Sequence, residues 1–328
     1  MSLHPDLAGF LELVELGRLT GASQPMHQMS VEQARAEFER SSQVLDPSPP
    51  DDLQVEHLQM VDGDGQPLSA RLYRRQSPVD GLQPVLLYFH GGGYVVGSLD
   101  SHDAVCRRLA ICSDFAVLAP AYRLAPEAPF PAAADDALAS ARWLVEHGEA
   151  QRLDARRVVV SGDSAGASLA IVVAAVAAQQ PEKAALRPLA QLLFYPVTDI
   201  SCQRPSHGKF AEGYLLESET LEWFYRHYVR DPSQRLDWRV SPLHLTALEG
   251  LAPTWMALAG HDPLLDEGVA WAHALEKAGV PLQWRVEEAL THDFLRMQGM
   301  VEAVEGIYAE VGRWLKAVGA GCQSNGNI

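Results

Sequence analysis

The sequence predicts an α/β protein whose mostly parallel sheet is covered by helices on both faces. Three observations support this prediction. From Pro84 onward, apolar runs of strand length alternate with helical patterns. Most of these runs are apolar at nearly every position, as in strands that are buried on both faces. Glycine-rich or polar motifs directly follow several runs, and in a parallel sheet such motifs gather at the carboxyl ends of the strands, where ligands bind.

The composition fits a globular protein and excludes several classes. The chain has 328 residues, 47% of them hydrophobic, and a formal net charge of −16. This charge repels nucleic acid and anionic membranes, so we expect neither as a partner. The four cysteines are irregularly spaced and form no C-x-x-C pair, which disfavours disulfides and zinc. Because no stretch has the pattern of a signal peptide or a membrane span, we expect a cytoplasmic protein without stable membrane insertion.

The first 75 residues precede the alternating pattern and predict two helices and a hairpin. Residues 5–45 show helical spacing, and the second helix starts at Ser30, where Gln33 three residues on completes a capping box. Prolines and serines over residues 41–52 predict a linker. The runs LQVEHLQMV and LSARLYRR flank the turn DGDGQ, which predicts a hairpin at a sheet edge.

Six further strands are predicted after Pro84. Their runs are VLLYF, FAVLAPAY, RVVVSG, AQLLFYP, TWMALAG and LQWRVEEA. The helical patterns between them include residues 102–112, 132–147, 165–179 and 267–278. Residues 200–245 interrupt the alternation and contain an aromatic helix, ETLEWFYRHYV. A connection of this length is usually functional or covers a site.

The pattern G-x-S-x-G occurs at residues 162–166, after a β-branched strand and before an alanine-rich helix. A sharp strand-to-helix turn exposes its serine beyond the sheet, and small flanking residues allow the turn to form. The alternative is a glycine-rich turn that only packs a helix on a strand. The context favours Ser164 as a nucleophile.

A serine hydroxyl needs a positioned base, and the base needs an acid that fixes its tautomer. Among the twelve histidines, His292 follows the last strand run, which fits the chain order serine, acid, histidine. Two acids precede it. Asp262 lies directly beyond a strand, where a turn-forming Asp-Pro is the alternative interpretation, and Asp266 opens the next helix, where a carboxylate can serve as a cap. We therefore predict Asp262 as the acid.

Three consecutive glycines follow His90 where a buried strand ends. Glycine suits backbone that takes unusual angles or lies close to another group. A phosphate loop is disfavoured because no Lys-Ser or Lys-Thr follows. A turn without chemistry, or a row of N–H groups facing a developing anion, remains.

These motifs together resemble the hormone-sensitive-lipase-like esterases of the α/β-hydrolase superfamily. HGGGYVVGS, YRLAPE, FPAAADDA, GDSAG, DPLLDEG and LEKAG follow one another in that family's order and spacing, over nearly the whole chain. The resemblance implies the α/β-hydrolase fold, with an eight-stranded, mostly parallel sheet and a helical cap. It implies a catalytic domain over 51–199 and 246–320, with cap material from residues 1–50 and 200–245. Residues 321–328 are expected to be a disordered tail.

The resemblance also implies the roles of individual residues. The triad would be Ser164, Asp262 and His292, and the oxyanion donors would be the N–H groups of Gly92, Gly93 and Ala165. His90 would support the oxyanion loop by hydrogen bonding, together with Gly91. No cofactor and no metal is implied.

The function implied is a serine carboxylic ester hydrolase that acts on small-molecule esters of short to medium chain length through an acyl-enzyme. An amidase such as an arylformamidase, or a lactonase, would use the same triad. A ligand receptor on this fold is disfavoured, because such receptors lose a triad member. Trp223, Phe224 and Tyr225 in the predicted cap indicate either an apolar pocket or helix packing. The protein is also compatible with a homodimer through a sheet edge.

The sequence departs from the family at three positions outside the triad. Asp293 follows His292 where the family usually has glycine. Ala167 follows GDSAG where many members have another glycine, and His261 occupies a variable position. We expect Asp293 to affect specificity and pH dependence more than mechanism.

Overall fold

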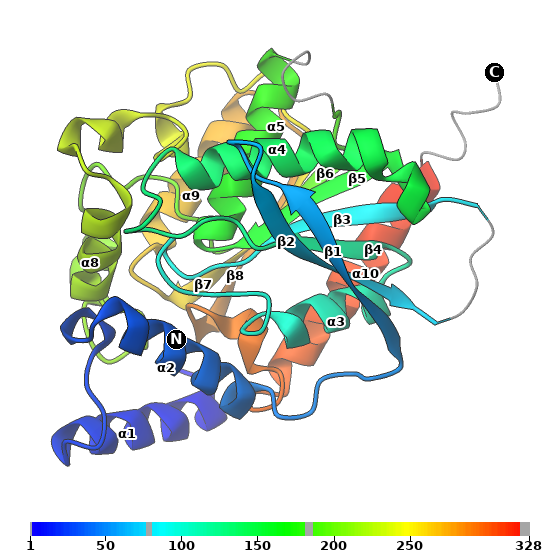
Figure 1. The fold of residues 1–328 in the computed structure, drawn as a ribbon. Coiled ribbons are helices and arrows are strands. Elements are labelled where there is room, and N and C mark those ends of the chain that lie inside the picture. The colour runs from blue at the N-terminus through cyan, green and yellow to red at the C-terminus, as the bar shows by residue number, and fades with distance from the viewer. Residues whose placement is uncertain (1, 77–80, 181–185, 322–328) are drawn as a thin grey trace.

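The computed structural model describes residues 2–76, 81–180 and 186–321, which form a central sheet between two layers of helices (Figure 1). The strands are β1 (Leu53–Val61), β2 (Pro67–Arg75), β3 (Gln83–Phe89), β4 (Ala116–Pro120), β5 (Leu153–Asp163), β6 (Ala190–Phe194), β7 (Thr254–His261) and β8 (Leu282–Thr291). Their order in the sheet is β1-β2-β4-β3-β5-β6-β7-β8. β2 is antiparallel to both of its neighbours, and all other neighbouring strands are parallel. The predicted sheet and the hairpin at its edge are confirmed.

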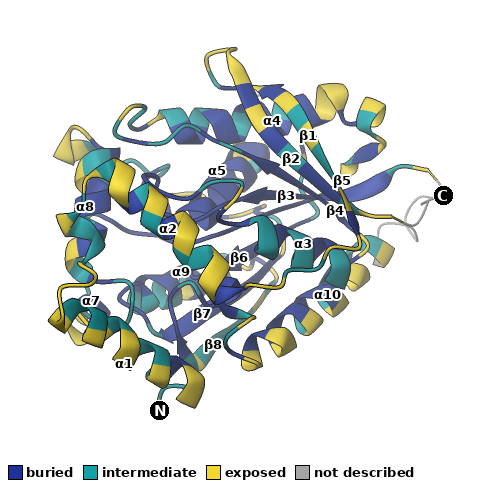
Figure 2. Ribbon diagram, turned by 60° about the horizontal axis from the view of Figure 1, so that its bottom comes forward, coloured by how far each residue is buried: buried dark blue, intermediate teal, exposed yellow. Residues whose placement is uncertain are grey.

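Helices cover both faces of the sheet because its central strands are apolar on both sides. α3 (Asp103–Cys112) and α10 (Ala303–Gly321) lie on one face, and α4 (Ala132–His147), α5 (Ala165–Gln179) and α9 (Leu265–Lys277) lie on the other. Alternate residues of β3 serve the two cores. Val85, Leu87 and Phe89 pack with α4 and α5, whereas Leu86 and Tyr88 pack with α3. Figure 2 shows the buried strands between helices whose outer faces are exposed.

Two N-terminal helices precede the sheet. They are α1 (Pro5–Leu19) and α2 (Val31–Leu45), with η1 (Met26–Gln28) between them. The predicted capping box at the start of α2 is confirmed. The Gln33 N–H donates to Ser30 Oγ at 3.2 Å, and the Ser30 N–H donates to Gln33 Oε1 at 3.0 Å.

The linker predicted from residue 41 begins too early, because α2 continues to Leu45. The hydroxyls of Ser41 and Ser42 each donate to the Phe38 carbonyl at 2.9 Å, so these serines bond back onto their own helix. Phe38 and Leu45 are buried, which holds the last turn of α2 against the molecule. The linker therefore starts after Leu45.

The segment 200–245 contains short helices, of which the first two lie beside α1 and α2 at one end of the sheet (Figures 1 and 2). They are α7 (Pro205–Lys209), α8 (Ser218–Tyr228), η3 (Pro232–Leu236) and η4 (Pro242–His244). α8 confirms the predicted aromatic helix. Two further short turns, η2 (Glu149–Gln151) and η5 (Phe294–Met297), lie outside this segment.

The C-terminal part of the chain differs from the prediction in two respects. α9 begins at Leu265, two residues earlier than expected. α10 was not among the predicted helices, and it extends to Gly321, so the predicted tail does not begin at residue 321. Residues 322–328 lie outside the described residues. Within the described ranges, no helix is long and apolar enough to cross a membrane.

Candidate active site

Ser164 sits in a tight turn between the end of β5 and the start of α5. Its backbone has φ 53° and ψ −121°, a conformation that costs energy for a residue with a side chain. The flanking glycines allow this turn. A Cβ on Gly162 would lie 2.4 Å from the carbonyl carbon of Gly166, and a Cβ on Gly166 would lie 2.0 Å from the Phe89 carbonyl oxygen. The chain therefore presents the Ser164 hydroxyl beyond the carboxyl end of the sheet.

Three predicted residues meet at this edge through a chain of hydrogen bonds. Ser164 Oγ lies 2.9 Å from His292 Nε2, and His292 Nδ1 lies 2.6 Å from Asp262 Oδ2. His292 directly follows β8, and Asp262 directly follows β7. The second carboxylate oxygen, Oδ1 of Asp262, accepts the N–H of Leu264 at 2.8 Å, which fixes the orientation of the acid. All three side chains are buried.

The buried carboxylate of Asp262 raises the pKa of His292. Burial lowers the pKa of His292, but Asp262 beside it raises the pKa more, so that the net pKa lies above the ordinary value. Asp293 acts in the same direction as Asp262. The arrangement can accept a proton from Ser164 and hold the resulting imidazolium.

Asp266 is not part of this chain of hydrogen bonds. It lies in the first turn of α9, but the N-cap position belongs to Leu264, whose side chain makes no capping hydrogen bond. The Asp266 N–H donates to Ser206 Oγ at 3.3 Å. The capping role expected for Asp266 is therefore not found. Its Oδ2 instead accepts the N–H of Ser206 at 2.8 Å, which joins α9 to the start of α7.

The glycine loop after β3 lies against Ser164. Gly92 and Gly93 have φ 114° and 59°, and both line the same pocket as the serine. The Gly91 N–H donates to Asp163 Oδ1 at 2.9 Å, so this donor is not available to a ligand. In the described parts of the chain, the N–H groups of Gly92, Gly93 and Ala165 have no hydrogen-bond acceptor. These three are the N–H groups predicted to face an oxyanion.

His90 supports this loop. Its Nδ1 lies 2.7 Å from the Gly91 carbonyl oxygen, to which it donates when it carries the proton. The Tyr122 hydroxyl donates to the His90 carbonyl at 2.7 Å, and the two rings stack with centroids 4.3 Å apart. Burial and the neighbouring His102 lower the pKa of His90 to about 3, so the ring is neutral at ordinary pH. In the described part of the chain, no hydrogen bond joins His90 to Ser164 Oγ, whose partner is His292.

Sequence reasoning missed a buried cluster beneath the glycine loop. Asp163, the second residue of GDSAG, accepts hydrogen bonds from Tyr88 and Gly91 and lies 3.3 Å from His102. The available signal was a charged residue at the end of β5, after the uncharged run Val158–Gly162. Its partners come from distant parts of the chain, and spacing does not predict them.

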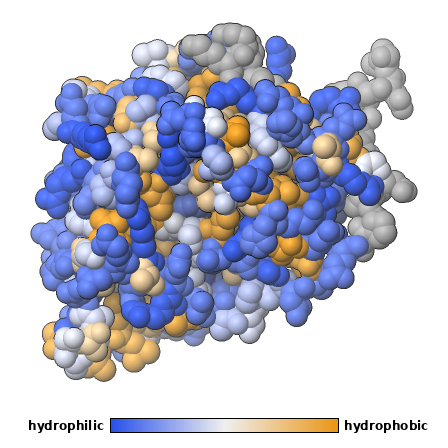
Figure 3. Space-filling view, viewed as in Figure 1, coloured by the Kyte–Doolittle hydropathy of each residue, from blue (hydrophilic) through white to orange (hydrophobic). Residues whose placement is uncertain are grey.

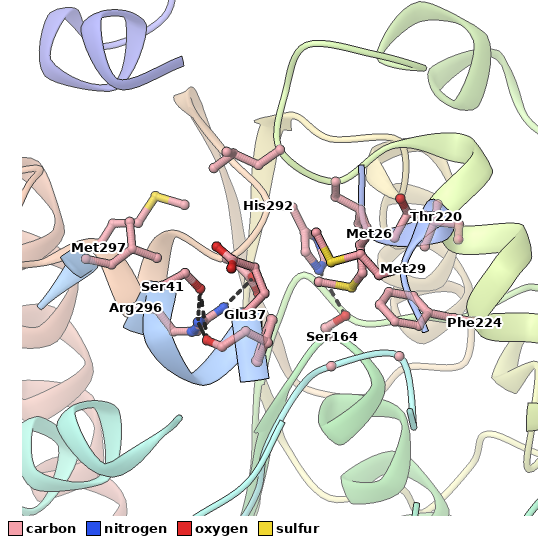
Figure 4. A pocket seen from close by; sticks show the side chains of 18 of the residues that line it. Met26, Met29, Glu37, Ser41, Ser164, Thr220, Phe224, His292, Arg296 and Met297 are labelled. Atoms are coloured by element: carbon pink, nitrogen blue, oxygen red, sulfur yellow. Dashed lines mark hydrogen bonds and ion pairs between the residues drawn. The ribbon is translucent and has the colours of Figure 1, made fainter. Parts of the chain in front are cut away.

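A pocket of about 210 Å³ opens onto Ser164 and His292 (Figure 4). Most of its lining is apolar. In Figure 4, Met26, Met29 and Phe224 lie beside the two residues, whereas Glu37, Arg296 and Met297 lie on the opposite side. Of the three aromatic residues singled out in α8, Phe224 and Tyr225 line the pocket. Trp223 does not, and its ring packs edge-on against His227 at 4.6 Å.

Asp293, which stands where the family usually has glycine, has a structural role at this pocket. Asp293 has φ 66°, a backbone conformation that favours glycine. Its carboxylate holds Arg296, whose Nη1 donates to Asp293 Oδ2 at 2.9 Å. The same guanidinium donates from Nη2 to the Phe38 carbonyl at 3.0 Å and to Ser42 Oγ at 2.6 Å, and it lies 3.7 Å from the Phe38 ring centroid. Arg296 thus joins α2 to the loop that carries His292.

The other two residues that differ from the family, Ala167 and His261, do not line the pocket. Ala167 is fully buried in α5, and His261 packs against the rings of Phe210 and Tyr214 at 5.5 Å. Among the described residues, no group of three or more histidine, cysteine, aspartate or glutamate side chains is arranged to hold a metal ion.

Comparison with known proteins places this geometry in a family. Residues 86–296 match the family described as the alpha/beta hydrolase fold. The chain is 49% identical over 309 residues to an ethyl acetate hydrolase of Pseudomonas putida, covering 94% of this chain and 96% of that protein. It is 42% identical over 241 residues to the carboxylic ester hydrolase LipN of Mycobacterium tuberculosis, covering 72% of this chain and 63% of that protein.

Solved structures of ester hydrolases are similar to this one over nearly the whole chain. An ester hydrolase from the metagenome of Lake Arreo, in complex with a bipyridine phosphonate derivative, superposes with a TM-score of 0.89 at 34% identity and covers 96% of this chain and 98% of that chain. A thermostable esterase from Pseudomonas putida superposes with a TM-score of 0.88 at 31% identity, with coverages of 96% and 97%.

Proposed function

Because the chain belongs to the hormone-sensitive-lipase-like esterases of the α/β-hydrolase superfamily and is a serine carboxylic ester hydrolase, we propose that it cleaves small esters of short to medium acyl chain at Ser164. One observation carries the assignment of the site. A continuous chain of hydrogen bonds runs from Asp262 through His292 to Ser164 Oγ, and its serine end opens into an apolar pocket.

The proposed reaction has two steps. Ser164 Oγ attacks the ester carbonyl carbon while His292 Nε2 takes the hydroxyl proton, and Asp262 stabilises the imidazolium through Nδ1. The tetrahedral oxyanion accepts hydrogen bonds from the N–H groups of Gly92, Gly93 and Ala165. His292 then returns the proton to the departing alcohol oxygen, which leaves an acyl-enzyme. Water attacks the acyl-enzyme with His292 again as the base, and the acid is released.

Small esters are favoured over other substrates of the same triad. The pocket has a volume of about 210 Å³ and a mostly apolar surface, which suits a small acyl group. The similar proteins carry the names of ester hydrolases, one of them an ethyl acetate hydrolase. Amidase and lactonase activities therefore rank below ester hydrolysis.

We assign the cap to α1, α2 and the 200–245 segment, over a catalytic domain made of residues 51–199 and 246–320. Residues of α1, α2 and α8 line the pocket on the side away from the sheet, which supports this division. A cytoplasmic location stays a prediction. So does a homodimer through β1 or β8, the edge strands of the sheet, which sedimentation of the purified protein would detect.

The nucleophile is tested by labelling with a fluorophosphonate. We expect one covalent adduct per chain, located on Ser164 by mass spectrometry of the digested protein, and complete loss of ester hydrolysis. Ser164→Ala should take up no label and have no activity. An adduct on another serine, or activity of the variant within about tenfold of wild type, would contradict the assignment.

The acyl preference is tested with p-nitrophenyl esters from acetate to laurate. The highest kcat/KM should lie at short to medium chains, because the pocket limits the length that can be buried next to Ser164. A clear preference for laurate would contradict this part of the proposal and leave the triad assignment intact.

A further inference from the structure

Asp163 is a fully buried carboxylate that the proposed reaction does not use. It precedes Ser164 in the chain and is not among the residues that line the pocket. Its Oδ1 accepts the Tyr88 hydroxyl at 2.5 Å and the Gly91 N–H at 2.9 Å, and its Oδ2 lies 3.3 Å from His102 Nε2. Tyr88 and His102 are also buried. Three donors from three elements thus converge on one carboxylate.

The contact with the glycine loop is close. A Cβ added to Gly91 would lie 2.3 Å from Asp163 Oδ2, so only glycine lets the loop approach the carboxylate this far. The approach explains the first glycine of HGGG, whose N–H is directed to Asp163 rather than to the pocket. The neighbouring Gly92 and Gly93 line the pocket.

The charges of this cluster follow from its hydrogen bonds. Burial raises the pKa of Asp163, but His102 and the Tyr88 hydroxyl lower it more, to about 2. An ionised carboxylate only accepts hydrogen bonds, so His102 Nε2 carries a proton toward it. Ser101 Oγ lies 2.9 Å from His102 Nδ1 and is also bonded to the backbone of Ser98, which fixes the other side of the ring.

We propose that Asp163, held by Tyr88 and His102, is the positioning residue that sets the oxyanion loop relative to the nucleophile. Its carboxylate fixes the Gly91 N–H, and the next donors of the loop then face Ser164. Because Asp163 and Ser164 are adjacent in the chain, one turn orients both the nucleophile and the N–H donors of the glycine loop. The proposal rests on the function proposed above for Ser164 and for the N–H groups of Gly92 and Gly93.

Other contacts hold the loop but do not tie it to the nucleophile turn. The Gly91 carbonyl accepts from His90, and the Gly92 carbonyl accepts from the N–H groups of Val95 and Val96 at 3.0 and 2.9 Å. These bonds lie within residues 90–96. The Asp163 contact joins the loop to β5, and a charged acceptor makes a stronger hydrogen bond than a neutral amide would. Its loss should therefore displace the donors relative to Ser164.

The test compares substitutions that keep or remove the donor to Asp163. His102→Leu removes the donor, whereas His102→Gln can place an amide N–H near the position of Nε2. Asp163→Asn removes the charge. The matched control is Asp154→Asn, which removes a buried carboxylate at the opposite end of β5, where Asp154 binds Arg156 and Arg157.

We would measure kcat and KM with p-nitrophenyl acetate at the pH plateau of each variant, because Asp163 also raises the pKa of His292. We would also measure inhibition by a trifluoromethyl ketone, whose adduct with Ser164 places an oxyanion at the loop. His102→Leu and Asp163→Asn should lower kcat by about tenfold to 100-fold with little change in KM. Inhibition by the ketone should weaken in parallel with kcat/KM. His102→Gln should keep most of the wild-type kcat and most of the wild-type inhibition. Asp154→Asn should leave both unchanged.

Two results would overturn the proposal. One is a folded His102→Leu or Asp163→Asn enzyme with wild-type kcat, and the other is a lowered kcat with unchanged inhibition by the ketone. If both variants fail to fold, Tyr88→Phe removes one hydroxyl and keeps the ring, and it should lower kcat several-fold at constant KM. A wild-type kcat in Tyr88→Phe would then overturn it. Failure of the function proposal is separate, because it would appear as a wild-type enzyme that the fluorophosphonate does not label at Ser164.

Discussion

Asp262 and Asp266 lie four residues apart, and the structure gives their carboxylates different partners. Asp262 binds His292 at 2.6 Å, and Asp266 binds the N–H of Ser206 at 2.8 Å. Asp262→Asn should lower kcat by on the order of 10,000-fold, because an amide neither holds the correct tautomer nor stabilises the imidazolium. Asp266→Asn should cost about 1 kcal/mol of unfolding free energy and leave kcat nearly unchanged. The measurements are kcat and the urea midpoint, and an inactive Asp266→Asn would reverse the assignment.

The charge of Asp293 should shift the acid limb of the pH profile, with Asp262 as the larger influence. His292 must be neutral to act as a base, so kcat/KM falls as the pH drops through its pKa. Burial lowers this pKa, and the carboxylates of Asp262 and Asp293 raise it. Asp293→Asn removes one stabilising charge from the imidazolium, and the acid limb should therefore move to lower pH. Asp266→Asn is the matched control, and an equal shift in that variant would show that the effect is not local to His292.

Single residues were predictable where a motif follows a strand. Ser164, Asp262 and His292 each come directly after a strand, and parallel strands bring such positions to one edge. The partners of Asp163 were not predictable in this way. His102 lies 61 residues away in sequence, and its contact depends on how α3 packs beneath the glycine loop.

The glycine loop after β3 is the element that ties the backbone conformation to the chemistry. A Cβ on Gly92 would lie 2.3 Å from the Val96 carbonyl oxygen, at a φ of 114°. Gly92→Ala should therefore distort the loop and lower kcat by about 100-fold or more, as loss of an oxyanion donor does. Gly65→Ala is the control, since Gly65 also has a positive φ but has open space around its Cβ position, in the turn between β1 and β2. It should lower the melting temperature and leave kcat unchanged. Equal kcat in the two variants would argue against the oxyanion role.

At the level of elements, the strands were predictable because each central strand is a nearly continuous apolar run. α10 escaped prediction, and its glycines explain part of the difficulty, because glycine weakens the helical signal. Gly312 has a packing reason that sequence alone does not reveal. A Cβ there would lie 2.2 Å from the Cys112 carbonyl oxygen, so α10 and α3 approach each other closely at this point.

The pocket is a property of the whole molecule, because three segments far apart in sequence build it. α1 and α2 supply one wall, α8 supplies another, and the catalytic edge of the sheet supplies the floor. No local pattern predicts how such segments meet. In Figure 3, hydrophobic side chains lie over α1 at the lower left, where Leu13, Leu16 and Leu19 are exposed. α1 therefore contributes little to the core, and Leu7 is its one buried residue among those described.

Two truncations separate the roles of the N-terminal helices. Removal of residues 1–29 deletes α1 and η1 but keeps the Ser30 cap of α2. The fold should survive, because α1 buries little. The pocket loses the walls formed by Phe10, Met26 and Met29, so KM for acetate esters should rise and the preferred acyl chain should lengthen. Ester kinetics on both proteins measure this, and unchanged KM and chain preference would mean that α1 does not bound the pocket in solution.

Removal of residues 1–45 should have a different effect, because it also takes away the α2 acceptors of Arg296. This buried guanidinium would lose the Phe38 carbonyl and the Ser41 and Ser42 hydroxyls and keep only Asp293 among those partners. The deletion also removes the buried α2 side chains of Ala34, Phe38 and Leu45 from the two cores. The longer truncation should therefore melt well below the shorter one and aggregate through newly exposed apolar surface. If the two truncations melt at the same temperature, Arg296 does not depend on α2, and the cap is held to the catalytic domain by other contacts.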